Sequence, residues 1–315
     1  MDTRDVQQLV KKECPDLLVE SIKPLNHGWY NYTFLINETI VIRIPKRHSY
    51  NIKKEWKVLE LLENTFTTPI PKCYHTSANA EFLAVEYVKG FCATTTDFMS
   101  WSETEKKNTA KGIARFLSEL HGYCKTEKCT EIDIDLYNYS KEVADIAEEF
   151  NIVQTWSELS DDTKIYVQKQ AEISTSFFLS AKHNVLVHND LHIGNIVFSK
   201  PGNIAGFIDF DAVKHGDRTL DFALIGSTMG WDTLIQTIAE YQTLTGISID
   251  PFIAWAINVD YLISLTIKSI KCGELNSVPL YIWWLNTARP EKTLTQEILT
   301  QKDLQNMLQS TVKKP

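Results

Sequence analysis

The sequence lacks the features that would place this chain in a membrane or in an oxidising compartment. Its six cysteines include no CxxC pair and fit no disulfide framework, so we expect reduced thiols in a cytoplasmic protein. The longest apolar stretch, residues 252–267, is interrupted by Asn258 and Asp260 and is too short to cross a bilayer. No apolar run follows Met1, so we expect no secretory signal and no membrane association.

Basic residues are also scarce where acidic ones gather. The net charge is −8, and residues 130–162 carry ten acids against the single base Lys141. A chain without a basic stripe offers few contacts to phosphates, so we expect no nucleic-acid partner. The acids are Glu131, Asp133, Asp135, Glu142, Asp145, Glu148, Glu149, Glu158, Asp161 and Asp162.

The 315 residues are enough for two lobes, and 43% hydrophobic with 23% charged residues is ordinary for a globular protein. Apolar periodicity predicts a helix behind Asp2 or Thr3 and a hairpin over residues 32–44 that turns at Asn37 and Glu38. A helix beginning near Ser49 or Asn51 and a strand over 81–88 follow. These elements predict a small α+β lobe that ends near Gly90.

Beyond this lobe the pattern becomes mostly helical. Ser102 and Glu105 fit a capping box, and helical periodicity covers residues 138–180 and 218–310. Between the two helical stretches, short apolar runs at 185–187, 196–198 and 207–208 predict a hairpin with acidic residues at its mouths. No internal repeat interrupts this order.

Polar residues at the mouths of that hairpin carry the chemistry. His188-Asn189-Asp190 is followed by Asn195 and, after the hairpin, by Ile208-Asp209-Phe210-Asp211. Phosphoryl transfer needs one carboxylate to accept the proton of an attacking hydroxyl and hard oxygen ligands to hold Mg²⁺. Asp190 suits the first role, and Asn195 and Asp209 suit the second.

Other interpretations of these residues exist. An Asp after an apolar strand is often a turn or N-cap residue. His188 and His192 have helical i, i+4 spacing, which permits a zinc site, but no Glu follows the first His. A chain that kept the fold without catalysis, a pseudokinase, is a further alternative.

The same residues resemble the signature of aminoglycoside phosphotransferases and their choline-kinase-like relatives. The strings 41–46 and 116–121 look particularly like the 2''-type enzymes. The resemblance implies a bilobal, protein-kinase-like α+β fold with a nucleotide-binding lobe over 1–88 and a helical lobe over 89–315. It also implies a catalytic hairpin at about 185–211 and an acidic helical insert at about 130–180.

Within that family resemblance, Asp190 is the expected catalytic base, and Asn195 and Asp209 are the expected Mg²⁺ ligands. His188 is expected to be structural. Asp221 matches a downstream Asp that braces the catalytic loop, although capping of a helix explains an Asp at this position equally well.

The small lobe supplies candidates for binding ATP or GTP. Strand alternation puts Val41 and Arg43 on one face, where a small residue lies under the base and a cation reaches the phosphates. Glu55 on the next helix is the expected partner of Arg43, and Lys46 is the rival cation. A surface cation and a solvated Glu are the alternatives.

Two further segments resemble nucleotide-binding elements. Gly28 lies in a turn that matches a phosphate-covering loop weakly, with one glycine only. Residues 84–90 resemble the linker between lobes, so Glu86 and Val88 are expected at the purine edge.

The expected reaction is Mg-dependent transfer of the γ-phosphoryl group of ATP or GTP to a hydroxyl of a cationic small molecule. An aminoglycoside is the first choice, and a macrolide, choline, an amino alcohol or a sugar is the alternative.

Acids of the 130–162 segment, with Glu240 and Asp260, are candidate acceptor contacts. C-terminal aromatic residues could stack on sugar rings, but core packing is the more frequent explanation. They are Trp255, Tyr261, Tyr281, Trp283 and Trp284. The sequence leaves the oligomeric state open and favours a monomer.

Overall fold

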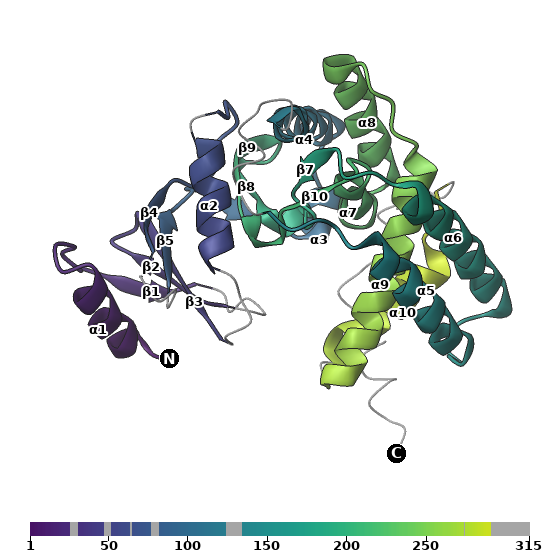
Figure 1. The fold of residues 1–315 in the computed structure, drawn as a ribbon, viewed down its shortest axis with the longest axis horizontal. Helices are drawn as coiled ribbons and strands as arrows, with labels where there is room; N and C mark the ends of the chain where they lie inside the picture. The colour runs from purple at the N-terminus through teal and green to yellow at the C-terminus, as the bar shows by residue number, and fades with distance from the viewer. Residues whose placement is uncertain are drawn as a thin grey trace.

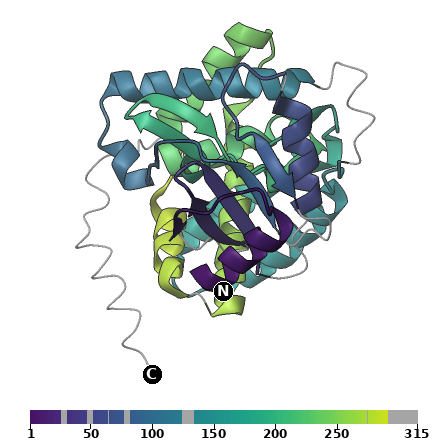
Figure 2. The ribbon, with the colours of Figure 1, turned by 90° about the vertical axis from the view of Figure 1, so that its left-hand side faces the viewer.

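The computed structural model describes residues 1–25, 31–46, 52–63, 65–76, 82–123, 134–273 and 275–290. Figure 1 shows a small lobe built on a β-sheet beside a larger, mostly helical lobe. Figure 2, turned by 90°, shows the sheet and the N-terminal helix in front of the larger lobe. The predicted α+β architecture is therefore confirmed.

The small lobe is a five-stranded antiparallel sheet between two helices. One helix packs Val6 and Val10 on a sheet face that carries Phe34, Ile42 and Ile44, and the other helix lies between the sheet and the larger lobe (Figure 1). In spatial order the strands are β1 (Ile22–Pro24), β2 (Asn31–Ile36), β3 (Ile40–Pro45), β5 (Leu83–Glu86) and β4 (Cys73–Thr76). The helices are α1 (Thr3–Glu13) and α2 (Ile52–Glu63).

Local sequence signals account for most of this lobe. Asp2 caps α1 through a capping box, and β2 and β3 form the predicted hairpin. Asn37 and Glu38 turn it with φ of 49° and 57°, in the left-handed region that Asn adopts readily. The strand predicted over 81–88 is shorter, and β1 and β4 were not predicted. Both predicted helix starts, Ser49 and Asn51, lie outside the described residues.

The larger lobe is built from helices around two short sheets. The helices are α3 (Thr95–Met99), α4 (Glu103–Tyr123), α5 (Tyr139–Gln154), α6 (Asp161–Ser180), α7 (Leu220–Met229), α8 (Trp231–Thr245), α9 (Pro251–Cys272) and α10 (Val278–Thr287). The strands are β6 (Phe91–Cys92), β8 (Ile196–Lys200) and β9 (Asn203–Phe207) in one sheet, with β7 (Val185–Val187) and β10 (Lys214–Gly216) in the other. The predicted Ser102–Glu105 capping box begins α4, with the Ser102 N–H donating to Glu105 at 2.8 Å.

The pairing of these short strands corrects one prediction. β8 and β9 form the expected hairpin, but β7 does not join it and instead pairs antiparallel with β10. The loop after β7 and the loop after β9 therefore leave different sheets and meet between them. Two 3₁₀ turns complete these loops, η2 (Ile193–Asn195) and η3 (Phe210–Ala212).

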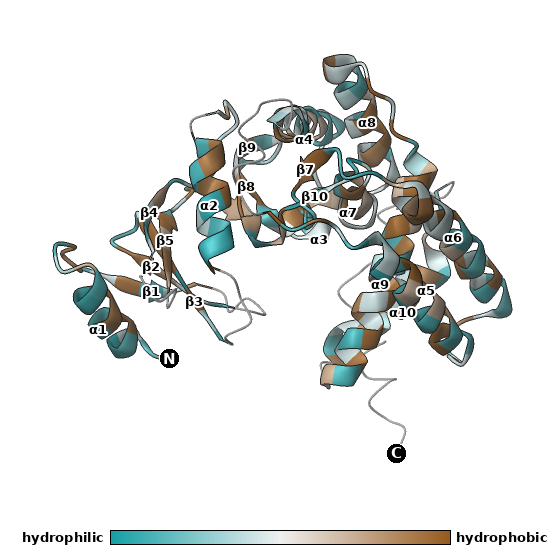
Figure 3. Ribbon diagram, in the orientation of Figure 1, coloured by the Kyte–Doolittle hydropathy of each residue, from teal (hydrophilic) through white to brown (hydrophobic). Residues whose placement is uncertain are grey.

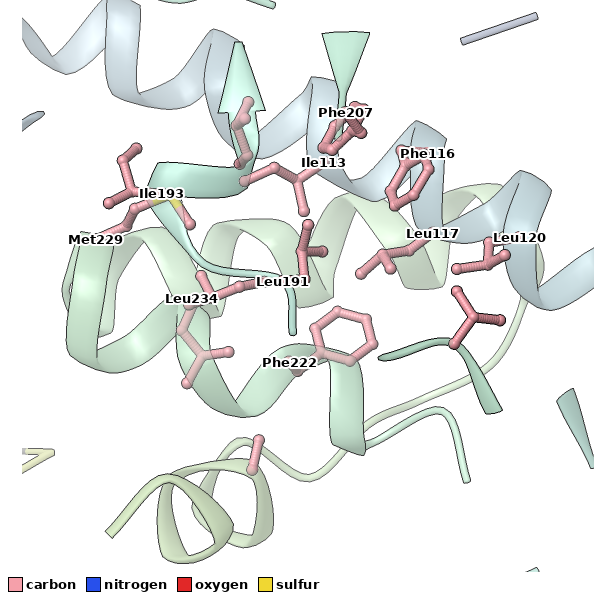
Figure 4. Close-up of a cluster of buried hydrophobic side chains, with 14 of the residues drawn as sticks. Ile113, Phe116, Leu117, Leu120, Leu191, Ile193, Phe207, Phe222, Met229 and Leu234 are labelled. Atoms are coloured by element: carbon pink, nitrogen blue, oxygen red, sulfur yellow. The ribbon is translucent and has the colours of Figure 1, made fainter. Parts of the chain in front are cut away.

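An apolar core lies directly beneath the loop that follows β7. Figure 4 shows Leu191 and Ile193 of this loop among side chains of α4, β9, α7 and α8. Phe116 stacks on Phe207 at 3.9 Å between ring centroids, and Phe222 is fully buried. Burial of side chains this large, roughly 1.5–3 kcal/mol each, makes the loop part of the rigid core.

Hydropathy separates the helices of the larger lobe. α9 is apolar along most of its length, whereas hydrophilic and hydrophobic residues alternate along α5 and α6 (Figure 3). By length and composition α9 could cross a membrane, but 67% of its most apolar window is buried inside the protein. A core helix shows the same burial.

Candidate active site

One buried carboxylate, that of Asp221, binds the main chain of the predicted catalytic loop after β7. Asp221 in the first turn of α7 accepts the main-chain N–H of His188 at 2.9 Å and of Asn189 at 2.7 Å. Its side chain is 1% exposed, and the N-cap of α7 is Thr219. The bracing interpretation of Asp221 therefore describes its contacts, and the capping alternative is wrong.

His188 joins the two loops and faces the core. Its ring is fully buried, and Nε2 donates to the carbonyl oxygen of Ile208 at 3.2 Å. Burial lowers the pKa of the His188 imidazole. Among the described residues no group of three His, Cys, Asp or Glu side chains is suited to holding a metal ion, so the zinc interpretation of His188 and His192 gains no support.

Asn195 fixes the position of Asp190. The Asn195 side-chain amide donates to the main-chain oxygen of Asp190 at 2.8 Å and to its carboxylate at 3.2 Å. The Asn195 main-chain oxygen accepts from the Ile208 N–H at 3.0 Å. These contacts bring the loop after β7 beside the residue that precedes Asp209.

Asp209 meets the small lobe through Arg43. The Arg43 guanidinium donates to Asp209 at 2.6 Å and, through its other terminal nitrogen, to Glu55. Glu55 is 2% exposed, and Asp209 adopts a left-handed backbone with φ of 72°. The predicted Arg43–Glu55 pair is present. The rival cation Lys46 lies over the Tyr32 ring, 5.3 Å from its centroid.

Negative charge exceeds positive charge at this point. Burial, followed by the nearby Asp209 carboxylate, raises the pKa of Asp190 to about 7. The same two causes raise the pKa of Asp211 to about 7. Glu55 and Asp209 contact the Arg43 guanidinium, and Asp190 and Asp211 lie near Asp209, so acids outnumber this one cation, an arrangement that favours a bound cation.

The donor set fits a hard divalent cation. The Asn195 amide nitrogen is used by Asp190, and within the described part of the chain its oxygen accepts no hydrogen bond. Asp209 likewise engages Arg43 through one carboxylate oxygen, Oδ1. An amide oxygen and a carboxylate oxygen beside an excess of acids are ligands that Mg²⁺ accepts, with water and phosphate oxygens for the remainder.

The other predicted nucleotide residues line the junction of the lobes. Val41 is half-buried on β3 and packs against the main core, on the same strand face as Arg43. Glu86 ends β5, and its carboxylate accepts weakly from the Lys72 N–H at 3.4 Å. Val88 follows in the connection to β6, close to Gly206 of β9. Gly28 lies outside the described residues.

The acidic segment divides into two groups. Exposed acids form a solvated surface, as charged residues usually do: Glu148, Glu158, Asp161 and Asp162. Burial raises the pKa of Glu142 and of Glu149, which accepts from Ser264 of α9 at 2.6 Å. Asp145 pairs with Lys141. Glu131 and Asp133 lie outside the described residues.

The start of this segment is tied to the catalytic sheet and to α2. The Asp135 main-chain oxygen accepts from the His215 N–H of β10 at 2.9 Å, and its carboxylate accepts from Lys54 at 3.2 Å. Because β10 pairs with β7, the acidic segment enters α5 from beside the catalytic loop.

Two further acids and the aromatic candidates are mostly engaged elsewhere. Asp260 is buried against Ser174, and burial raises its pKa to about 8. Glu240 forms an ion pair with Lys111 of α4 at 4.0 Å. Trp255 and Trp284 stack on each other in the core at 5.2 Å, as the packing interpretation predicts. Tyr281 and Trp283 also pack against this core. Tyr261 on α9 is 43% exposed.

Sequence reasoning missed two residues that contact this machinery. His121 of α4 contacts the Asp221 carboxylate at 3.0 Å, and Tyr241 of α8 contacts the other nitrogen of His121 at 2.9 Å. His121 ends the string 116–121 that carries part of the family resemblance, but the string assigned it no role. Tyr241 has no local sequence signal.

A sheet-based lobe, a helical lobe and an acid-amide-acid loop set between them define a kinase-like phosphotransferase. The model of the phosphotransferase enzyme family matches residues 21–249, and the chain belongs to this family. The predicted family, fold and enzyme class are thereby confirmed.

Solved structures share this fold along nearly their whole length. A 2''-aminoglycoside phosphotransferase of type IIIa, in complex with GDP and kanamycin, matches with a TM-score of 0.75 and 18% identity over 89% of this chain and 97% of that one. The gentamicin complex of the type IIa enzyme matches with a TM-score of 0.67 and 24% identity over 92% and 98%. A type I macrolide 2'-phosphotransferase matches with a TM-score of 0.65 and 17% identity over 92% of this chain and 99% of that one.

Proposed function

We propose that this protein transfers the γ-phosphoryl group of ATP or GTP, with Mg²⁺, to a hydroxyl of an aminoglycoside. The observation that carries the proposal is the meeting of Asp190, Asn195 and Asp209 with Arg43 at the junction of the two lobes. The nucleotide would lie between residues 1–88 and 89–315, with Val41, Glu86 and Val88 near its base and Gly28 in the phosphate turn.

Each residue has one task in this reaction. Asp190 accepts a hydrogen bond from the attacking hydroxyl and receives its proton as the new phosphate ester bond forms. The bond between the γ-phosphorus and the bridging oxygen breaks at the same time, and ADP or GDP leaves. Asn195 keeps Asp190 oriented through its amide. Arg43, held by Glu55, neutralises phosphate oxygens. The Asn195 oxygen and Asp209 would hold Mg²⁺, which when bound would neutralise charge on the phosphates.

The acceptor is assigned from the charge of the acidic insert. Glu142 and Glu149 are half-buried on α5, which enters from beside the catalytic loop. The basic side chains that act on them are Lys141 and Lys214 at Glu142 and Lys271 at Glu149. Partly buried carboxylates favour a polycationic ligand over a neutral one. Kanamycin and gentamicin are bound by solved proteins of the same fold, which supports this class of acceptor.

A panel of acceptors tests the proposal. The purified protein is incubated with Mg²⁺, ATP or GTP, and kanamycin, gentamicin, a macrolide, choline or a sugar alcohol, and the phosphorylated product is measured by mass spectrometry. We expect product with an aminoglycoside. Product with the macrolide alone would transfer the proposal to that class, which a fold neighbour favours. Binding of nucleotide without any product would favour the pseudokinase alternative.

A further inference from the structure

A line of three buried polar side chains runs from α8 to the catalytic loop. The Tyr241 hydroxyl lies 2.9 Å from Nδ1 of His121, and Nε2 of His121 lies 3.0 Å from the Asp221 carboxylate. Tyr241 is fully buried, His121 is 4% exposed and Asp221 is 1% exposed. Since the three residues belong to α8, α4 and α7, the contacts exist only when these helices are packed.

Asp221, the last of these three residues, binds the main chain of the loop that carries Asp190. The Asp221 oxygen that faces His121 also accepts the His188 main-chain N–H, at 2.9 Å. Its other oxygen accepts the Asn189 N–H at 2.7 Å. A rotation of the Asp221 carboxylate would therefore shift the backbone immediately before Asp190.

The proton on His121 decides whether that carboxylate is held. A neutral imidazole donates a hydrogen bond to a carboxylate only through the ring nitrogen that carries the proton. When a donor group occupies one ring nitrogen, the proton is held on the other. A phenol at Nδ1 donates its proton and leaves the N–H on Nε2, facing Asp221. Burial raises the pKa of the Tyr241 phenol, so this donor stays protonated.

We propose that Tyr241 is a positioning residue, which fixes the His121 tautomer and thereby the orientation of Asp221 and of the Asp190 loop. This role rests on the proposed phosphoryl transfer. Tyr241 touches no reacting atom in it. The hydroxyl acts through His121 and the Asp221 carboxylate. Its loss should therefore reduce stabilisation of the transition state more than it reduces the affinity for either substrate.

The Tyr241 ring also packs against its neighbours, and a phenylalanine at this position would keep that packing while it lacks the hydroxyl. The ring lies edge-on to His121 at 5.5 Å and to Phe222 at 5.2 Å. Tyr241→Phe keeps both contacts and removes only the hydroxyl. Tyr166→Phe is the control, because the Tyr166 hydroxyl also accepts a side-chain hydrogen bond, in a part-buried position, from Trp255 Nε1 at 2.6 Å.

The kinetic test compares these two variants. We expect Tyr241→Phe to lower kcat about three- to tenfold, the range that loss of one buried hydrogen bond covers. KM for nucleotide and for acceptor should stay within about twofold of wild type. Tyr166→Phe should leave kcat unchanged. Equal losses of kcat in both variants, or no loss in Tyr241→Phe, would overturn the proposal.

A double-mutant cycle tests the route through His121. Glutamine in place of His121 carries an amide N–H that does not depend on a partner at the other end. In the His121→Gln background, Tyr241→Phe should therefore cause no further decrease in kcat. A decrease as large as in the wild-type background would show that the hydroxyl acts by another route and would reject the tautomer mechanism.

Amide hydrogen exchange separates this inference from the proposed function. The main-chain N–H groups of His188 and Asn189 should exchange severalfold faster in Tyr241→Phe than in wild type or Tyr166→Phe, whether or not a phosphoryl acceptor is found. A protein inactive towards every acceptor but showing this change would lose the proposed function and keep the positioning role. Unchanged exchange at both groups would contradict it.

Discussion

The side-chain amide of Asn195 donates to both the main-chain oxygen and the carboxylate of Asp190, at 2.8 and 3.2 Å. One residue thus orients the proposed base with its nitrogen and leaves its oxygen toward the proposed metal. The 3₁₀ turn η2, which ends at Asn195, turns the chain back towards Asp190 five residues earlier. Base and metal ligand are therefore positioned together.

Replacing Asp190 separates catalysis from binding. In Asp190→Asn the amide cannot accept the proton of the attacking hydroxyl, so we expect kcat to fall by about 10²–10⁴. Nucleotide affinity, measured by calorimetry, should change less than about threefold because Asp190 is not among the proposed phosphate contacts. Wild-type turnover in this variant would remove Asp190 from its assigned role.

Asp209 should set the requirement for Mg²⁺. Chelation with EDTA should abolish transfer by the wild-type protein, and added Mg²⁺ should restore it. Asp209→Asn loses an anionic ligand, so the Mg²⁺ concentration at half-maximal activity should rise at least about tenfold. An unchanged Mg²⁺ titration would show that the ion binds elsewhere. Circular dichroism would verify that the variant is folded.

Glu55 is expected to hold Arg43 in place for the phosphates. Glu55→Gln replaces the carboxylate that pairs with the part-buried Arg43 guanidinium by a neutral amide, so we expect nucleotide affinity to fall about tenfold and the free energy of unfolding to fall by about 2 kcal/mol. Glu60→Gln, at an exposed position of the same helix, is the control and should change neither. Equal behaviour of the two variants in nucleotide titration would contradict the assignment.

Asp260 should make stability depend on pH. Its pKa is about 8 in the folded protein, well above its ordinary value of 3.8, so between about pH 4 and pH 8 the folded state keeps a proton that the unfolded state releases. This contribution lowers stability as pH rises through that window, by at most about 1.4 kcal/mol per pH unit, and is constant above and below it.

Asparagine at position 260 removes this titration while it retains a polar partner for Ser174. Asp260→Asn should be more stable than wild type at pH 8, and the difference should shrink towards pH 4. Urea unfolding at several pH values measures it. A constant difference between the two proteins across that range would show that Asp260 is ionised in the folded state.

Gly90, where the chain passes between the lobes, should tolerate no side chain. Its φ is 155°, and a Cβ there would overlap the main-chain oxygen of Phe198. Gly90→Ala should lower the free energy of unfolding by about 1–3 kcal/mol. Gly246→Ala, at a φ of 73° where the added Cβ meets no atom within 4 Å, is the control for a methyl group added without a clash. Equal destabilisation would show that contact with Phe198 contributes nothing.

The sequence alone determined the elements and the chemistry that lies within one loop. Alternating residues determined the β2–β3 hairpin, Asp2 determined the start of α1, and the spacing of Asp190 and Asn195 determined their contact, because each depends on neighbours a few residues away. Hydrophobic period and capping are local properties that any reader of the chain can evaluate.

Tertiary structure alone decided which distant groups meet. Arg43 and Asp209 are 166 residues apart, His121 and Asp221 are 100 apart, and β7 pairs with β10 rather than with the adjacent hairpin. The burial that raises the pKa of Asp260 depends on how α6 packs against α9. Such contacts depend on the packing of whole elements, and local sequence patterns do not specify which buried faces come together.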